Sequence, residues 1–263
     1  MSKQDDQNTK DTMTRRQFLR KGGYVAGGAV GGALLGGLIT QQVTKPKTTE
    51  QHGGETKGAG EEQRYTQALM YFRKQEDFNV LAQACERIFP EDELGPGAIG
   101  LDVPYYIDHQ LAGAWGNNAR DFMLGPFYPG LKTQGFQSHL RRNEIFSQGI
   151  AMMQAYSQKN YQLNFTELTD EQQDEVLVAF EQGDVPMDGV TSPEFFTLLR
   201  MVVLEGVYAD PLYGGNRDMA GWQMKGFPGS QMSYLAVIDS EEFYTEPPES
   251  LHAHMSSPVR KTK

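Results

Sequence analysis

The chain contains very little cysteine. Cys85 is the only one among 263 residues, so no intrachain disulfide can form. A single thiol cannot ligate an iron–sulfur cluster, and the Cys-x-x-Cys-His pattern of covalently attached haem is missing. Cys85 belongs to an apolar stripe at helical spacing that ends at Pro90 and comprises Phe78, Leu81, Ala82, Cys85, Ile88 and Phe89. We therefore expect a buried, unreactive thiol in the core.

Recognisable catalytic and metal-binding motifs are also missing. None of the five histidines has a second histidine or a cysteine at ligand spacing. The chain has no Gly-x-Ser-x-Gly motif and no glycine loop of the kind that cradles phosphate. Two carboxylates, Asp210 and Asp218, flank a long turn-rich segment, and Asp210 is placed to cap the turn made by Pro211. We expect no catalytic residue, no metal and no cofactor in this chain.

Basic charge is scarce after residue 45. The first 45 residues hold seven Lys and Arg and three Asp and Glu, which leaves 17 basic and 31 acidic residues from Pro46 onward. The resulting formal charge of −14 repels nucleic acid and anionic lipid, so no nucleic-acid partner is expected. An acidic balance is also ordinary for a soluble exported domain.

A long, strongly apolar run is missing as well. Residues 22–39 are uncharged but include eight glycines, which makes them a poor dedicated membrane span. Before them stand Arg15 and Arg16, followed by Phe18 and Leu19. Paired arginines, an apolar pair and a weakly hydrophobic segment are typical of a twin-arginine export signal. Because that pathway moves folded proteins, we expect the twin-arginine translocase as a partner. The expected location is the periplasm or the outer face of the cytoplasmic membrane.

Composition divides the chain into four stretches. Residues 1–40 form the signal, which is either removed or kept as an anchor, because no clear cleavage site follows it. Residues 41–62 are polar and predict a flexible linker, residues 63–240 predict a helical domain, and residues 241–263 predict a polar tail.

Helix-capping residues recur through the third stretch. Expected helix starts are marked by Asp102 with Pro104, by Thr169 with Gln172, and by Thr191 with Pro193 and Glu194. Gly183 is expected to end the second of these helices. No alternating strand pattern competes, so we predict a mostly α fold, a single irregular helical domain with long ordered loops. The turn-rich loops are residues 90–100, 115–130 and 210–229.

Three segments resemble one known family over about residues 75–230. The first is Ala84-Cys85-Glu86-Arg87-Ile88-Phe89-Pro90-Glu91-Asp92, continuing through Gly95-Pro96-Gly97-Ala98, and the second is Val103-Pro104-Tyr105-Tyr106-Ile107-Asp108 with Gln110-Leu111-Ala112-Gly113. The third and most specific runs from Glu205 to Asp218 and includes Asp210-Pro211-Leu212-Tyr213-Gly214-Gly215-Asn216-Arg217, with Gly221-Trp222 and Gly226-Phe227-Pro228-Gly229 after it. These segments resemble the small subunit of flavin-dependent gluconate 2-dehydrogenases, the subunit 3 or gamma-subunit family.

The resemblance implies a role without chemistry of its own. In that family the small subunit has no redox centre and accompanies a large FAD-bearing subunit of the glucose–methanol–choline type. A multihaem cytochrome c often accepts the electrons. The large subunit commonly lacks an export signal, so the small one supplies it for the pair. The resemblance therefore implies an export and maturation escort for a gluconate, sugar or polyol dehydrogenase, and it carries over no catalytic residues.

We place partner docking on residues 210–229. Tyr213, Arg217, Trp222 and Phe227 are of types enriched at interface hot spots. The turn at Gly214-Gly215-Asn216 would present Tyr213 and Arg217 outward. The alternative is that the loop packs on its own domain, with Trp222 and Phe227 in the core and Arg217 paired with Asp218. Residues 90–100 are a second docking candidate.

Two other functions stay open at this point. The chain could be a stand-alone exported hydrolase that uses loop carboxylates such as Asp210 and Asp218. It could also be a membrane-tethered structural protein without a redox partner.

Overall fold

The computed structural model describes residues 67–128, 130–134, 137–235 and 237–252. The described α-helices are α2 (Gln75–Ile88), α3 (Val103–Ala112), α4 (Arg142–Tyr161), α5 (Asp170–Gln182), α6 (Ser192–Tyr208) and α7 (Ala220–Lys225). Four short 3-10 helices are η3 (Lys132–Gln134), η4 (Phe165–Glu167), η5 (Pro211–Tyr213) and η6 (Arg217–Met219). The described residues contain no strand, only two isolated bridges. The predicted mostly α class is confirmed, whereas the domain boundaries stay a prediction.

Local capping chemistry sets several helix ends where the sequence predicts them. The side chain of Thr169 accepts a hydrogen bond from the Gln172 amide, and the Thr191 side chain does the same for Glu194. These are the reciprocal caps that satisfy otherwise unpaired amides in a first helical turn. Gly183 ends α5 in the left-handed conformation, at φ 88°.

Asp102 departs from this pattern. It occupies the N-cap position of α3, but its backbone is left-handed (φ 59°) and its side chain makes no capping hydrogen bond. The predicted start of the helix is correct, but the predicted capping hydrogen bond to the Asp102 side chain is wrong. The carboxylate of Asp102 pairs instead with Arg217, which is more than one hundred positions away in the chain.

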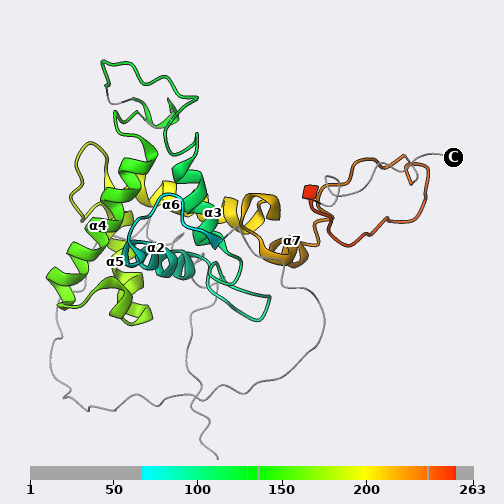
Figure 1. Ribbon diagram of the computed structural model, residues 1–263, viewed down its shortest axis with the longest axis horizontal. Helices are drawn as coiled ribbons and strands as arrows, with labels where there is room; N and C mark the ends of the chain where they lie inside the picture. The colour runs from blue at the N-terminus through cyan, green and yellow to red at the C-terminus, as the bar shows by residue number, and fades with distance from the viewer. Residues whose placement is uncertain (1–66, 129, 135–136, 236, 253–263) are drawn as a thin grey trace, which may run out of the picture.

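The core lies among α2 to α6, which Figure 1 shows gathered on one side of the molecule with α7 at its edge. The predicted stripe of α2 is buried except for the half-buried Ala82, and Cys85 is fully enclosed. Burial, together with the charge of Glu86, raises the pKa of the Cys85 thiol well above its usual value. Gly149 on α4 lets the Phe195 ring approach, since a Cβ there would meet the ring at 2.2 Å.

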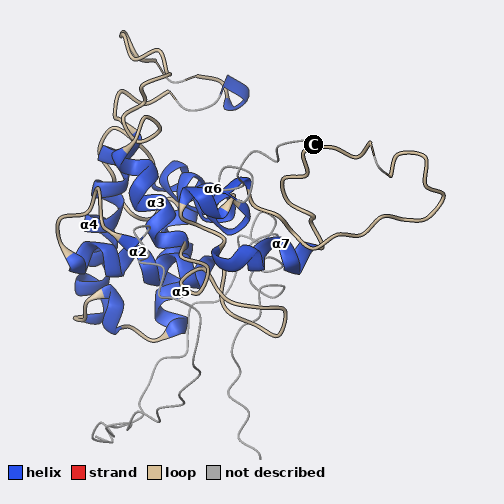
Figure 2. Ribbon diagram, turned by 45° about the vertical axis from the view of Figure 1, so that its right-hand side comes forward, coloured by secondary structure: helices blue, strands red, loops and turns tan. Residues whose placement is uncertain are grey.

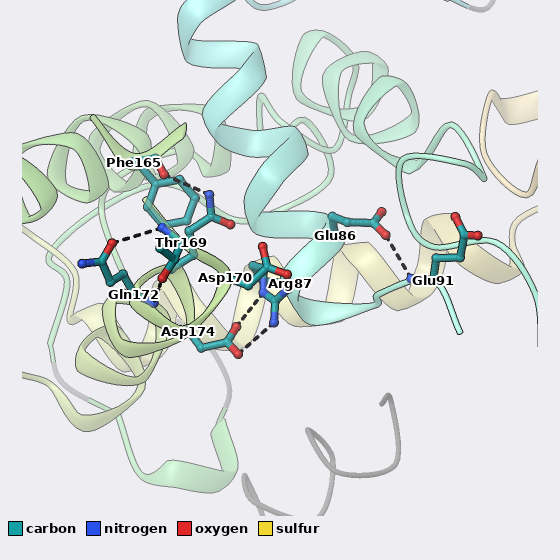
Figure 3. A network of polar contacts seen from close by, with 9 residues as sticks. Glu86, Arg87, Glu91, Phe165, Thr169, Asp170, Gln172 and Asp174 are labelled. Atoms are coloured by element: carbon teal, nitrogen blue, oxygen red, sulfur yellow. Dashed lines mark hydrogen bonds and ion pairs between the residues drawn. The ribbon is translucent and has the colours of Figure 1, made fainter. Parts of the chain in front are cut away.

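An ion-pair network centred on the buried Arg87 joins α2 to α5 (Figure 3). The Arg87 guanidinium donates to both oxygens of Asp174, at 2.8 and 2.9 Å, and lies 2.7 Å from the Asp170 carboxylate. The neighbouring Glu86 accepts hydrogen bonds from the amides of Glu91 and Ile99, at 3.0 and 2.8 Å. Two adjacent charged residues of α2 therefore have structural roles. Arg87 holds α5, and Glu86 holds the loop of residues 90–100.

Residues 70–72, which precede α2, are hydrogen-bonded to α3. The fully buried Asp108 carboxylate accepts the amides of Met70, Tyr71 and Phe72, at 2.5, 3.1 and 2.8 Å. Three amides on one carboxylate compensate a buried charge that would otherwise be costly.

Two irregular segments project from the helical body in Figures 1 and 2. One comprises the described residues between 119 and 140 and exposes Phe122, Leu124, Phe127, Tyr128 and Leu131. The other, residues 230–250, leaves the body beyond α7 and returns to it. None of the helices in the described part of the chain is both long and apolar enough to span a bilayer.

Candidate partner interface

Residues 210–229 begin at Asp210, directly after α6. One Asp210 oxygen caps η5 by accepting the Leu212 amide at 2.9 Å, as the sequence predicts. The same carboxylate accepts the Ser250 hydroxyl at 2.7 Å and the Leu251 amide at 2.8 Å, with the Ser230 hydroxyl at 3.4 Å. Burial opposes ionisation of Asp210, but these hydrogen bonds outweigh it and lower the pKa of the carboxyl.

The segment after η5 lies against the last turn of α6. Asn216 is fully buried, donates its amide to the Ala209 carbonyl at 2.8 Å and accepts the Gly221 amide at 2.7 Å. A Cβ on Gly215 would lie 2.3 Å from the Gly206 oxygen, and one on Gly221 would lie 2.1 Å from the Val207 oxygen. Only glycine permits backbone to approach backbone this closely.

The segment around η6 has an unusual backbone. Asn216, Asp218 and Met219 all have positive φ, at 48°, 56° and 57°. The left-handed region is tolerated by Asn and Asp but is rare for a residue such as Met. Such a conformation persists only where surrounding contacts hold it, and it is common at functional loops.

Arg217 fastens this loop to α3. Its guanidinium donates to both Asp102 oxygens, at 2.8 and 2.5 Å, while its amide donates to the Leu101 carbonyl at 3.2 Å. The hydrogen bond to Asp102 is the main cause that raises the pKa of Arg217. Arg217 is held by a buried carboxylate on the same domain, although its side chain keeps 33% of its surface exposed, so a role of Arg217 in docking stays a prediction. The alternative pairing with Asp218 is not met.

The aromatic residues of the loop divide between core and surface. Trp222 is 5% exposed and donates its indole N–H to the Tyr208 carbonyl at 2.8 Å. Phe227 meets the Trp222 ring edge to face at 5.4 Å, yet it is 48% exposed. Tyr213 is 53% exposed, and the neighbouring Leu212 is also exposed. The exposed side chains that a partner could contact at this loop are therefore Tyr213, Phe227 and Leu212. Docking at this loop stays a prediction.

The carboxylates considered for hydrolysis have different surroundings. Asp210 accepts four hydrogen bonds and has a lowered pKa, which suits a structural anion better than a proton acceptor. Asp218 lies in a left-handed turn, and its carbonyl accepts the Gln223 side chain. Across the described ranges, no three His, Cys, Asp or Glu side chains are grouped so that they could hold a metal ion.

Reasoning from the sequence missed the projecting segment of residues 230–250, which we call the C-terminal arm. The sequence predicts a helical domain up to residue 240 and a polar tail from residue 241, so the arm spans both predicted stretches. Its exposed large side chains are Met232, Tyr234, Leu235, Ile238, Phe243 and Tyr244. The sequence does signal this segment, because several large apolar side chains occur close together among acidic residues. They do not follow the periodicity of a helix or a strand, so no element is predicted from them.

The export-signal residues Arg15, Arg16, Phe18 and Leu19 lie outside the described residues. A family model described as gluconate 2-dehydrogenase subunit 3 matches residues 75–229. That range runs from α2 through the loop that contains Arg217 and Trp222. Neither the curated proteins nor the solved structures contain a significant match.

Proposed function

The chain belongs to the gluconate 2-dehydrogenase subunit 3 family, and from that premise we propose that it is a non-catalytic subunit and export escort. Its proposed partner is a large FAD-bearing dehydrogenase of the glucose–methanol–choline type that oxidises gluconate or a related sugar or polyol. A cytochrome c subunit is the proposed electron acceptor. The family match over residues 75–229 carries this proposal.

The contacts of the charged groups support a role without catalysis. Asp102 and Asp174 are each held by an arginine, while Asp108 and Asp210 accept several backbone or hydroxyl donors. Groups engaged in this way shape and hold loops, and they are poorly suited to exchange protons with a substrate. FAD would be bound by the large subunit, so this chain would contribute surface and not chemistry.

The proposed docking surface is the outer side of residues 210–229. Tyr213 and Phe227 are exposed there on a loop that Asp210, Arg217 and Trp222 fix to the body. A rigid loop that exposes aromatic side chains loses little conformational entropy on binding. Arg217 and Trp222 act in this proposal by holding the loop in shape.

The proposed export role depends on Arg15 and Arg16. The twin-arginine translocase would recognise them and carry the folded pair to the periplasm or the outer face of the cytoplasmic membrane, with the signal cleaved or kept as an anchor. In the double variant Arg15→Lys, Arg16→Lys, this chain and the flavoprotein should both stay in the cytoplasm. An Arg20→Lys control keeps the arginine pair and should export normally.

The decisive experiment is co-purification of the tagged full chain with its genomic neighbours. A bound protein with a flavin absorption spectrum and dye-linked gluconate or polyol oxidation supports the proposal. A colourless chain that purifies alone, with the neighbours expressed, contradicts it. Normal export of the flavoprotein in the double-arginine variant contradicts the escort role even if the complex forms.

A further inference from the structure

The C-terminal arm exposes an unusual amount of apolar surface. Phe243 is 97% exposed and Leu235 is 81% exposed, so almost nothing of their own domain covers them. Met232, Tyr234, Ile238 and Tyr244 add to the same segment. Single exposed apolar residues need no explanation, but six large ones within a single projecting segment mark an interaction surface.

Backbone hydrogen bonds hold together the two ends of the arm, where residues 228–230 and 249–251 form what we call its root. The Ser230 amide donates to the Glu249 carbonyl at 2.7 Å, and the Glu249 amide donates to the Pro228 carbonyl at 3.1 Å. A Cβ on Gly229 would lie 2.3 Å from the Glu249 oxygen and 2.8 Å from the Trp222 ring. The two ends of the arm therefore meet beside Trp222, directly after the exposed Phe227.

Asp210 connects this root to the docking loop. Its carboxylate accepts the hydroxyl of Ser250, the last residue of the arm, and the amide of the following Leu251, while it caps η5 through its Leu212 contact. Within the arm, the Tyr234 and Tyr244 rings meet edge to face at 6.3 Å. The arm is thus continuous with residues 210–229, the surface already proposed for docking.

The charge of the arm disfavours two classes of partner. Residues 230–250 include five acidic residues and no Lys or Arg, with the acids at Asp239, Glu241, Glu242, Glu246 and Glu249. An anionic membrane surface repels such a segment. A second copy would place the same acidic arm or an acidic domain against it, which like-charge repulsion disfavours. These charges favour a different protein as the partner, one whose contact surface carries Lys and Arg beside apolar side chains.

We propose that the C-terminal arm is a clasp that closes on the catalytic subunit of the complex. Leu235 and Phe243 enter apolar depressions on that subunit, and Glu241 and Glu242 face basic side chains around them. Tyr and Phe are among the residue types enriched at protein interfaces. This assignment rests on the proposed function, since it takes the dehydrogenase subunit as the partner.

Excising the arm tests the assignment. Because its two ends are hydrogen-bonded to each other, residues 232–247 can be replaced by Gly-Ser while the root is kept. The probe is the flavin-bearing subunit that co-purifies with the wild-type full chain, and binding is measured by calorimetry. We expect at least about hundredfold weaker binding with an unchanged helical circular dichroism spectrum. Equal binding by the excised chain overturns the clasp but leaves the proposed function intact. Failure of the wild-type chain to bind any flavoprotein overturns both.

Substitutions of exposed side chains test the same contact without removing any backbone, so a loss of binding cannot be attributed to misfolding of a shortened chain. Leu235→Ser with Phe243→Ser should weaken binding by at least about tenfold. The matched control is Val178→Ser with Met201→Ser, which changes exposed apolar residues on α5 and α6 and should leave binding unchanged. Equal losses in both pairs would overturn the assignment.

The charge component has its own measurement. Glu241→Gln with Glu242→Gln should slow association with the flavoprotein and flatten its salt dependence. Unchanged association would contradict the basic border. Arm-dependent binding to vesicles of anionic lipid, or arm-dependent dimers of this chain in sedimentation, would assign the arm to a membrane or to a second copy and overturn the clasp.

Discussion

Replacing Asp210 by Asn should open the root of the C-terminal arm without unfolding the helical body. One Asp210 oxygen caps η5, and the other accepts the Leu251 amide at 2.8 Å. Asparagine keeps one oxygen but puts an NH₂ group in place of the other. If the cap at Leu212 is retained, two donors then face each other at Leu251.

The magnitude follows from the lost contact. A hydrogen bond to a charged group contributes roughly 1.5–3 kcal/mol, and a buried donor left unpaired costs about 1–3 kcal/mol. Taking about 2 kcal/mol for the local opening, the open state of the root becomes about thirtyfold more populated. The helical body keeps its own contacts, so the free energy of global unfolding should change by much less.

Hydrogen exchange followed by mass spectrometry or NMR measures this directly. The Leu251 amide should exchange about thirtyfold faster in Asp210→Asn, while amides of α5 and α6 keep their protection. Asp218→Asn is the matched control, because it removes the same charge from the same loop and leaves the arm root untouched. Equal acceleration in both variants, or loss of protection throughout the helices, would refute this account of Asp210.

Three further predictions follow from buried groups. Hydrogen bonds outweigh burial and hold the pKa of Asp210 below its usual value in the folded chain. The stabilisation of the root by Asp210 is therefore present above the usual carboxyl range and is lost as the pH falls through the lowered pKa. Leu251 protection should hold at pH 5, and its loss there would contradict the assignment. Asp174→Ala removes two hydrogen bonds from the buried Arg87 but leaves it paired with Asp170, so the unfolding free energy should fall by about 1.5–3 kcal/mol in urea titration. A loss below about 0.5 kcal/mol would show that the Asp174 contact contributes little to the fold. The Cys85 thiol, whose pKa burial raises, should react with a thiol reagent only as fast as the chain opens, and rapid labelling of native protein would contradict its placement.

The features that could be predicted from the sequence are those set by residues close together in the chain. The caps at Thr169 and Thr191 join residues three positions apart, and the stop at Gly183 needs only its own backbone freedom. The burial of Cys85 followed from helical periodicity. Each of these signals is complete within a few residues, so propensity and pattern were sufficient.

The misplaced features depend on distant partners. Asp102 and Arg217 are more than one hundred positions apart, and no local rule pairs them. Residues 210–229 were identified as one important loop, but their division into buried Trp222 and exposed Tyr213 follows from how the loop packs against α6. The arm was missed because its apolar residues follow no period.

The pairing of Asp102 also has a consequence for the order in which the chain matures. Asp102 accepts the Gln67 side chain at the entry to the domain as well as the Arg217 guanidinium near its end. During synthesis, Arg217 leaves the ribosome only after α2 to α6 have already emerged. Until then the Asp102 carboxylate has no guanidinium, and the entry segment lacks part of its attachment. The joint at the entry to the domain is therefore completed only after α2 to α6 have been synthesised, so a complete set of Asp102 contacts marks a chain in which these helices are present.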